Sequence, residues 1–218
     1  MAPSLRAMRA LLIPAALGTV ALAGCGLGDD GPRTTQSRDV AGFTRIDTRG
    51  SVDVRLRVGG PQRVRVTAGE KVIDDVHTDV RDGTLRVTFD HDGFGGDDVV
   101  VEASVPSLEG VDVSGSGNVD AEGIAADTFE VVADGSGDVA LDGTTGRLVV
   151  DIDGSGNADL VALAAREARV TVGGSGDAEV RAAEKLAVSV DGSGGVRYHG
   201  DPALSQTVDG SGDVTHAN

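Results

Sequence analysis

From residue 109 onward, apolar and polar residues alternate in short segments separated by a recurring Gly-Ser-Gly tripeptide. The tripeptide begins at six glycines that are 18 to 20 residues apart, namely Gly115, Gly135, Gly154, Gly174, Gly192 and Gly210. Self-similarity at such a period is typical of solenoid proteins, in which each repeat forms one turn, or rung, of a stack.

Aligning the six copies on their first glycine reveals apolar columns. The position two residues before that glycine holds Val113, Ala133, Ile152, Val172, Val190 and Val208. The position four residues before it holds Val111, Val131, Val150, Val170, Val188 and Gln206, so only the last copy is polar. Because the column between these two is mostly polar, the segment is predicted to be a strand with alternate residues buried.

A second alternating segment follows each tripeptide. It begins four residues after the first glycine, at Val119, Val139, Ala158, Ala178, Val196 and Val214. Each repeat therefore reads as strand, glycine corner, strand and looser connection. Because the same residue types return to the same column in every copy, we predict an all-β fold. Its architecture should be a parallel β-helix, or β-solenoid, with rungs of about 19 residues, rather than an antiparallel sandwich.

The corners are the most regular feature of the chain. Their candidate structural residues are Gly115, Gly117, Asn118, Gly135, Gly137, Asp138, Gly154, Gly156, Asn157, Gly174, Gly176, Asp177, Gly192, Gly194, Gly210, Gly212 and Asp213. We expect positive φ angles at corner glycines such as Gly137 and Gly156, since a residue without a Cβ adopts them readily.

Asparagine and aspartate alternate at the position after the tripeptide in the first four copies. In a stack, each Asn amide could donate to a neighbouring Asp, which predicts a structural ladder. The alternative is a calcium column that also uses the acids just before the corner, Asp134, Asp153, Asp191 and Asp209. The glycine and aspartate spacing of calcium-binding β-rolls is missing, and we expect neither a metal nor a cofactor.

Residues 39–108 are less periodic but still β-like. Four segments have strand character: 51–58, 63–68, 85–89 and 99–105. The first two flank Gly-Gly-Pro-Gln at 59–62, which is a hairpin-like signal, and residues 71–75 could form one helical turn. We expect this region to supply the first rungs and an irregular N-terminal β cap of a single domain, 39–218.

The N-terminal residues have the features of an export signal. Arg6 and Arg9 precede an apolar stretch at 10–22, which is too short to span a bilayer stably but suits a signal peptide. The stretch ends in Leu-Ala-Gly-Cys, which resembles a bacterial lipobox, and Cys25 is the only cysteine. We expect a lipoprotein signal peptide at 1–24, acylation of Cys25 and a flexible tether at 25–38. A free structural thiol is the alternative.

Composition narrows the class of protein. The chain has 33 glycines, only five aromatic residues and a formal net charge of -16 among 218 residues. The core must therefore be thin and built from Val, Leu, Ile and Ala. An acidic chain without a basic run argues against nucleic acid or anionic lipid headgroups as partners.

The Gly-Ser-Gly-Asp/Asn-Val corners, with Phe-Thr-Arg-Ile-Asp at 43–47 and Gly-Ser-Val-Asp-Val at 50–54, resemble a bacterial family. It is the putative auto-transporter adhesin family with a head GIN domain, a domain of unknown function. The resemblance covers residues 39–218. It implies a parallel β-helix on the cell surface or in the periplasm, and it supplies no catalytic or binding residues.

Signs of catalysis or metal binding are sparse. A catalytic serine is needed once, whereas Gly-Ser-Gly occurs six times without a following helix or lysine. His77, His91, His199 and His216 lack the spacing of a zinc site, and the acidic loop at 90–98 lacks the closing glutamate of a calcium loop.

We therefore expect a non-enzymatic, lipid-anchored envelope protein, extracytoplasmic at the cell surface or in the periplasm. Its role would be that of an adhesin-like or scaffold module that binds an envelope protein or a polysaccharide. A carbohydrate-active β-helix enzyme and a calcium-dependent structural module remain as alternatives.

Overall fold

The computed structural model describes residues 30–89 and 99–217. The expected signal peptide at 1–24, Cys25 and the acidic loop at 90–98 lie outside these residues. The strands before the regular repeats are β1 (Arg33–Arg38), β2 (Arg45–Gly50), β3 (Val52–Val58), β4 (Arg63–Gly69), β5 (Val76–Arg81), β6 (Thr84–Phe89), β7 (Val99–Val105) and β8 (Gly110–Gly115). The later strands are β9 (Val119–Gly135), β10 (Val139–Ile152), β11 (Ala158–Val172), β12 (Ala178–Gly192), β13 (Val196–His199), β14 (Ala203–Gly210) and β15 (Val214–His216).

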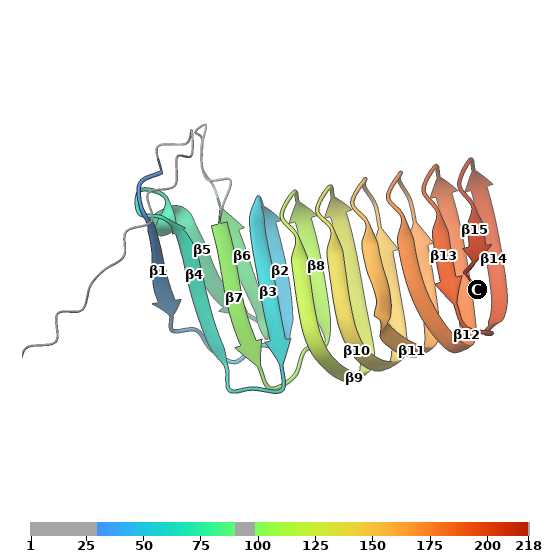
Figure 1. Cartoon of the computed structure of the whole chain (residues 1–218), viewed down its shortest axis with the longest axis horizontal. Coiled ribbons are helices and arrows are strands. Elements are labelled where there is room, and N and C mark those ends of the chain that lie inside the picture. Colours follow the sequence, from blue (N-terminus) through green and yellow to red (C-terminus); the bar gives the residue numbers. More distant parts are fainter. Residues whose placement is uncertain (1–29, 90–98, 218) are drawn as a thin grey trace, which may run out of the picture.

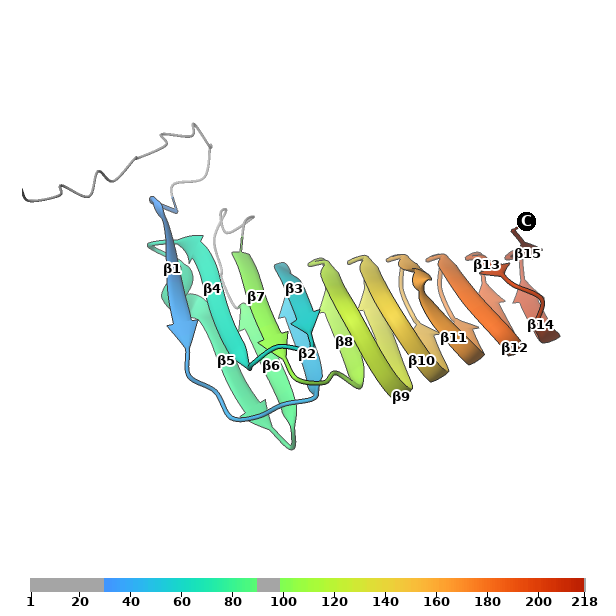
Figure 2. The same cartoon turned by 60° about the horizontal axis from the view of Figure 1, so that its bottom comes forward.

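The strands build a flattened β-solenoid with two long sheets (Figures 1 and 2). We call the sheet formed by β1, β4, β7, β3, the first segments of β9 to β12, β13 and β15 the first sheet. The second sheet contains β5, β6, β2, β8, the last segments of β9 to β12, and β14. Each of β9 to β12 begins after a corner in the first sheet, bends, and ends in the second sheet before the next corner. One continuous strand therefore includes both strand segments that lie between two corners.

The register confirms the columns read from the sequence. In the first sheet, Val139 lies between Val119 and Ala158, and Ala178 lies between Ala158 and Val196. In the second sheet, Ile152 lies between Ala133 and Val172. All of these pairings are parallel, as a stack of equivalent rungs requires.

The core between the sheets is narrow. Its members are almost all Val, Leu, Ile and Ala, and Phe129 and Phe43 are the buried aromatic residues, at 0% and 4% exposure. Small side chains suffice because the two sheets contribute one alternate set of residues each to a single layer. The composition therefore follows from the architecture.

The first part of the chain enters the stack out of sequence order. The rung formed by β2 and β3 lies between the rung of β8 and β9 on one side and that of β6 and β7 on the other. Gly50 pairs with Gly115, so the turn between β2 and β3 is a corner like those of the later repeats. The first rung in sequence is therefore not the first rung in space.

Three expectations for this region need correction. The segments at 51–58 and 63–68 do not form a hairpin, because β7 lies between β3 and β4, parallel to the former and antiparallel to the latter. The expected tether at 25–38 is too long at its C-terminal end, because β1 pairs with β4 over six residues. The helical turn is shorter than expected, a 3-10 turn over Ile73–Asp75.

Strand β1 has no apolar alternation that would distinguish it from a tether, because all six of its residues are polar, with the sequence Arg-Thr-Thr-Gln-Ser-Arg. An edge strand at the end of a sheet needs no apolar face when backbone pairing holds it. Here a hydroxyl contact supports that pairing, since Thr35 Oγ1 lies 2.9 Å from Thr67 Oγ1. The strands at this end are antiparallel, unlike the parallel rungs that follow.

Candidate functional site

The predicted corner residues stack along one edge of the solenoid, where the second sheet turns into the first. The carbonyl oxygen of each first corner glycine from Gly115 to Gly192 accepts two hydrogen bonds from the next rung. For example, the N–H groups of Ser136 and Gly137 donate to Gly115 O at 2.8 and 3.1 Å. The same pair of bonds recurs at every later corner, with Ser211 and Gly212 donating to Gly192 O at 2.9 and 3.1 Å.

Two features of the backbone require glycine at the corners. Gly115 has a φ of 144°, in the region that disfavours other residues. Gly137 and Gly156 do not have positive φ, which corrects our expectation. A Cβ on Gly137 would instead collide with the carbonyl oxygen of Gly117 directly beneath it. Gly135, at the first corner position, has no positive φ either, and a Cβ there would likewise collide with the carbonyl oxygen of Gly115. Close approach of two backbones therefore requires glycine at both corner positions.

The Asn/Asp column forms a hydrogen-bonded ladder on the outside of these corners. Asn157 donates to Asp138 Oδ1 through both its backbone N–H, at 2.9 Å, and its side-chain amide, at 3.0 Å. Asp138 N–H in turn donates to Asn118 Oδ1 at 3.0 Å. Asp53 adds a rung that our alignment left out, accepting from the backbone and side chain of Asn118 at 2.9 and 3.2 Å.

The ladder explains why amides alternate with carboxylates. Each side-chain oxygen accepts from a backbone N–H of the next rung, and each Asn also supplies a side-chain donor. Among residues 30–89 and 99–217, no group of three or more His, Cys, Asp or Glu side chains is arranged to hold a metal ion.

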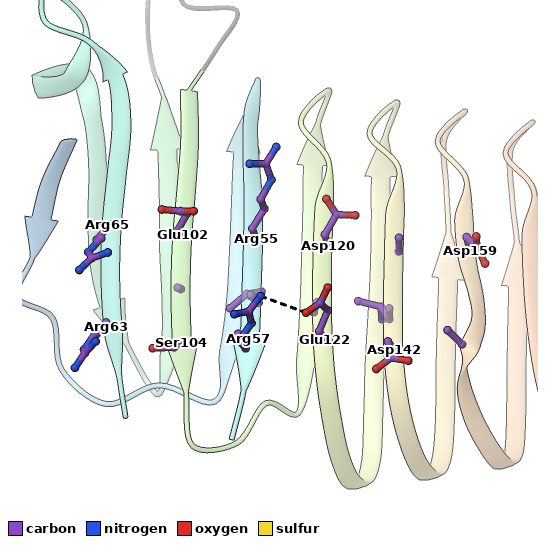
Figure 3. Close-up of a pocket in the computed structure, with 16 residues that line it drawn as sticks. Arg55, Arg57, Arg63, Arg65, Glu102, Ser104, Asp120, Glu122, Asp142 and Asp159 are labelled. Carbon is purple, nitrogen blue, oxygen red and sulfur yellow. Dashed lines mark ion pairs between the residues drawn. The ribbon is translucent and has the colours of Figure 1, made fainter. Parts of the chain in front are cut away.

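A second feature, which the sequence reading missed, lies on the outer surface of the first sheet. A shallow hollow of about 650 Å³ crosses strands β4, β7, β3, β9, β10 and β11. Its charged lining residues are Arg55, Arg57, Arg63, Arg65, Glu102, Asp120, Glu122, Asp142 and Asp159 (Figure 3). No aromatic residue lines it.

The charges in this hollow are separated into two halves. Arg63 and Arg65 lie on β4 and Arg55 and Arg57 on β3, with only Glu102 as an acid on the intervening β7 (Figure 3). We call the outer surface of β4, β7 and β3 that carries these four arginines the arginine face. The neighbouring half, on β9 to β11, carries acids only: Asp120, Glu122, Asp142 and Asp159.

The arginine face is only partly neutralised. Arg57 pairs with Glu122 at 3.5 Å, and both side chains are largely exposed, at 79% and 68%. Within the described part of the chain, Arg55, Arg63 and Arg65 have no carboxylate within 4.0 Å. Arg63 also faces Ser104 rather than an acid in the register of β4 and β7. Arg65 and Arg55 both face Glu102, and Arg55 also faces Asp120, but neither arginine forms an ion pair with these acids. Three guanidinium groups without a close carboxylate therefore stand on this face, with Glu102 shared between two of them.

The signal for this face was present in the sequence. Arg-Leu-Arg at 55–57 and Arg-Val-Arg at 63–65 place arginines at alternate strand positions, so each pair must share a face. What could not be read was their proximity, since they come together only because β7 inserts between β3 and β4. The net charge of -16 concealed this local basic region.

Another charged cluster lies on the second sheet around two aspartates. Asp47 is 6% exposed and accepts from Arg49 Nε and Nη2, both at 3.1 Å, with Arg86 Nε at 3.6 Å. Asp112 faces Asp47 across the β2–β8 pair. Burial raises the pKa of Asp112, and the Asp47 carboxylate raises it further, against the opposing effects of Ser114, Arg49 and Arg45.

Because the two arginines already occupy Asp47, this cluster resembles a structural ion network more than a free acid–base pair. The raised pKa of Asp112 means that the fold disfavours its ionised form, so the stability that the protonated carboxyl contributes is lost as pH rises through that pKa. We therefore regard the arginine face as the stronger candidate for ligand binding.

No helix in the described segments is long and apolar enough to cross a membrane.

Comparison with known proteins identifies relatives of this fold. A family model described as "Putative auto-transporter adhesin, head GIN domain" matches residues 42–202. A crystal structure of a putative adhesin from Bacteroides fragilis is 21% identical, with a TM-score of 0.70, and covers 88% of this chain and 100% of its own. Putative adhesins from Parabacteroides merdae and Parabacteroides distasonis are 22% and 24% identical, with TM-scores of 0.58 and 0.57.

The alignments cover 88% and 86% of this chain and 98% of each Parabacteroides protein. At these identities the likeness shows the fold, which is the β-solenoid described above. A search of curated proteins finds no match.

Proposed function

Since the chain belongs to the "Putative auto-transporter adhesin, head GIN domain" family, we propose that it is a non-enzymatic, adhesin-like binding module of the cell envelope. Its partner would be an envelope polymer that carries carboxylate or phosphate groups, bound on the arginine face. Acylation of Cys25 would hold the protein at the membrane, outside the cytoplasm.

The observation that carries this proposal is the set of unpaired guanidinium groups on the arginine face. A guanidinium group presents a planar set of N–H donors that matches two oxygens of a carboxylate or phosphate. Arg55, Arg63 and Arg65 stand on rigid strands whose inward residues are buried, so their Cα positions are fixed. A polymer with repeated anionic groups could therefore contact several of them at once.

The shape and lining of the hollow also favour a binding role. It is shallow and open, which suits part of an extended polymer better than enclosure of a small molecule. Its lining offers charges and short apolar side chains such as Leu56, Ala103 and Leu141 rather than aromatic platforms for sugar stacking. Recognition would thus depend on charge, and binding should weaken as salt concentration rises.

The acidic half of the hollow would set the orientation and limit of binding. Asp120, Asp142 and Asp159 repel an anionic polymer that extends over β9 to β11. A bound chain should therefore stay over β4, β7 and β3 and should not extend along the solenoid axis onto β9 to β11. The same acids would reject partners whose charge is spread uniformly over a large surface, such as a nucleic acid duplex.

The test compares two double variants of the full chain. Arg63→Gln/Arg65→Gln removes two unpaired charges from the arginine face, whereas Arg166→Gln/Arg169→Gln removes the same charge from exposed positions elsewhere. We expect the first to weaken binding to polygalacturonate or polyphosphate about tenfold or more, which corresponds to about 1.4 kcal/mol. The second should have little effect, and neutral dextran should not bind any form.

Calorimetric or interferometric titration at two salt concentrations provides the measurement, with melting curves to show that both variants are folded. Polygalacturonate and polyphosphate separate a carboxylate partner from a phosphate partner. Equal binding by the wild type and both variants would exclude the arginine face as the site. Cleavage of the polysaccharide during the titration would contradict the non-enzymatic role.

A further inference from the structure

The C-terminal end of the solenoid is open. Strand β14 pairs only with β12, and β15 pairs only with β13, so both strands have a free edge within the described residues. Figures 1 and 2 place these strands at the end of the stack opposite β1. All eight residues of β14 are exposed.

This end exposes residues that every earlier rung buries. Leu204 and Val208 are 38% and 37% exposed and are the exposed large hydrophobic residues of the described chain. They continue the columns of Leu186 and Val190, which are each only 1% exposed. A free strand edge next to apolar side chains is a surface on which another strand can add.

We propose that this open end is a self-association surface, on which two copies of the chain join tail to tail with β14 antiparallel to β14 of the second copy. The exposed surface is the one by which each rung already packs on the next, so the dimer would continue the intramolecular stack. A two-fold axis would relate the copies, and the contact would close after two chains.

The sequence of β14 suits pairing with itself. In an antiparallel register centred on Gln206, Leu204 lies opposite Val208 of the other copy, so both apolar columns continue across the contact. Gln206 would lie opposite its own counterpart. It stands where the preceding rungs have apolar residues such as Val170 and Val188. A side-chain amide both donates and accepts, so it can pair with an identical group at a two-fold axis.

The same register avoids direct like-charge contacts. Asp209 would lie opposite Ala203 of the other copy, and Ser205 opposite Thr207, so no two acids face each other across the strands. The remaining electrostatic repulsion between the two copies is long-range, since residues 99–217 contain 21 Asp and Glu but only six Lys and Arg. Dimerisation should therefore strengthen with added salt, which screens this repulsion.

The first test is sedimentation of the full chain carrying Cys25→Ser, so that neither a lipid nor a native thiol contributes. We expect a reversible monomer–dimer equilibrium whose dimer fraction rises with salt. Val208→Lys should shift it to monomer by at least about tenfold in the dissociation constant. Thr207→Lys adds the same charge on the outward side of the same strand and should leave the dimer intact.

A cross-linking test locates the contact independently of any effect of Val208→Lys on folding. In the Cys25→Ser background, Gln206→Cys should form a disulfide-linked dimer under mild oxidation, because each thiol would face its counterpart at the axis. Ser37→Cys, at an exposed position of strand β1 at the opposite end, is the matched control and should cross-link much more slowly.

Three results would overturn the proposal. A chain that stays monomeric over the whole concentration range at high salt has no such surface. A dimer that survives Val208→Lys with a folded melting curve uses another contact. Equal cross-linking through Ser37→Cys and Gln206→Cys would show that the ends do not differ. None of these results depends on the arginine face, so binding of an anionic polymer is tested separately.

Discussion

The glycines in the second corner position show how one atom limits the sequence. Each lies over the backbone of the preceding rung, at Val52 for Gly117 and at a glycine for the others, at a distance that leaves no room for a side chain. Any Cβ would face a carbonyl oxygen, and a backbone oxygen cannot move aside as a side chain can. The serine between the two glycines is free of this restriction, since Ser136 is exposed.

We therefore predict that Gly137→Ala lowers stability whereas Ser136→Ala hardly changes it. The added methyl group would force adjacent rungs apart, at a cost of about 1–3 kcal/mol as for other overpacked sites. For a domain of this size that cost would lower Tm by about 2–4 °C for each kcal/mol. Thermal unfolding followed by circular dichroism gives both values, and equal losses for the two variants would contradict the close-approach explanation.

At the level of strands, the repeated part of the chain was predictable from sequence and the first part was not. From residue 109 onward, every column read from the alignment pairs in the structure, because each rung contacts the rungs that precede and follow it in sequence. Periodicity reports such local pairings directly. It cannot report that β2 pairs with both β6 and β8, because those contacts join segments far apart in the chain.

The candidate site also has a part that could be predicted from the repeat and a part that depends on long-range pairing. The hydrogen-bonded column was visible because Asn118, Asp138 and Asn157 occupy equivalent repeat positions. Asp53 belongs to the same column, but Val52 replaces the second corner glycine beside it, so the pattern was incomplete. The arginine face depends on the insertion of β7 between β3 and β4, which no local pattern encodes.

The modular part of the solenoid should tolerate loss of a whole repeat. Deletion of residues 138–156 joins Gly137 to Asn157 and so restores a complete corner in register. We expect this variant to fold with reduced stability, since stability in such arrays is a sum over rungs and their interfaces. Deletion of residues 138–147 alone should prevent folding of the following rungs, because it joins a corner to the middle of a strand.

Circular dichroism and melting curves distinguish these outcomes, with the full-length chain as reference. The arginine face lies on β3, β4 and β7, which all precede the deletion, so the 138–156 variant should also keep most of its affinity for an anionic polymer. If both deletions unfold alike, the rungs do not behave as independent modules.

On the scale of the whole molecule, charge is distributed unevenly along the solenoid. Residues 30–89 contain eleven Lys and Arg against nine Asp and Glu, whereas residues 99–217 contain six against 21. An acidic end is repelled by an anionic membrane surface, and a balanced end is not. With a lipid on Cys25, the long axis would therefore tend to point away from the bilayer, with the open end of the stack outermost.

We predict that Cys25→Ser abolishes membrane association, because removal of the thiol prevents acylation. Fractionation of cells that express the two forms, with detection of the protein in membrane and soluble fractions, is the measurement. Cys25→Ala serves as a second variant, and Ser37→Ala as a control outside the lipobox. Unchanged partition of the Cys25 variants into membranes would show that the protein is held there by something else.

The out-of-order rung of β2 and β3 has a consequence for how the protein acquires its fold. During export from the N-terminus, β2 would emerge long before its partner β8. Arg45 pairs with Gly110, so this pairing cannot form until residue 110 has been exported. Closing that long segment costs more chain entropy than closing a loop of one repeat. Contacts between distant segments slow folding, whereas each later rung can dock as soon as it emerges. We therefore expect a slow nucleation step within residues 33–115, followed by fast templated growth toward the C-terminus.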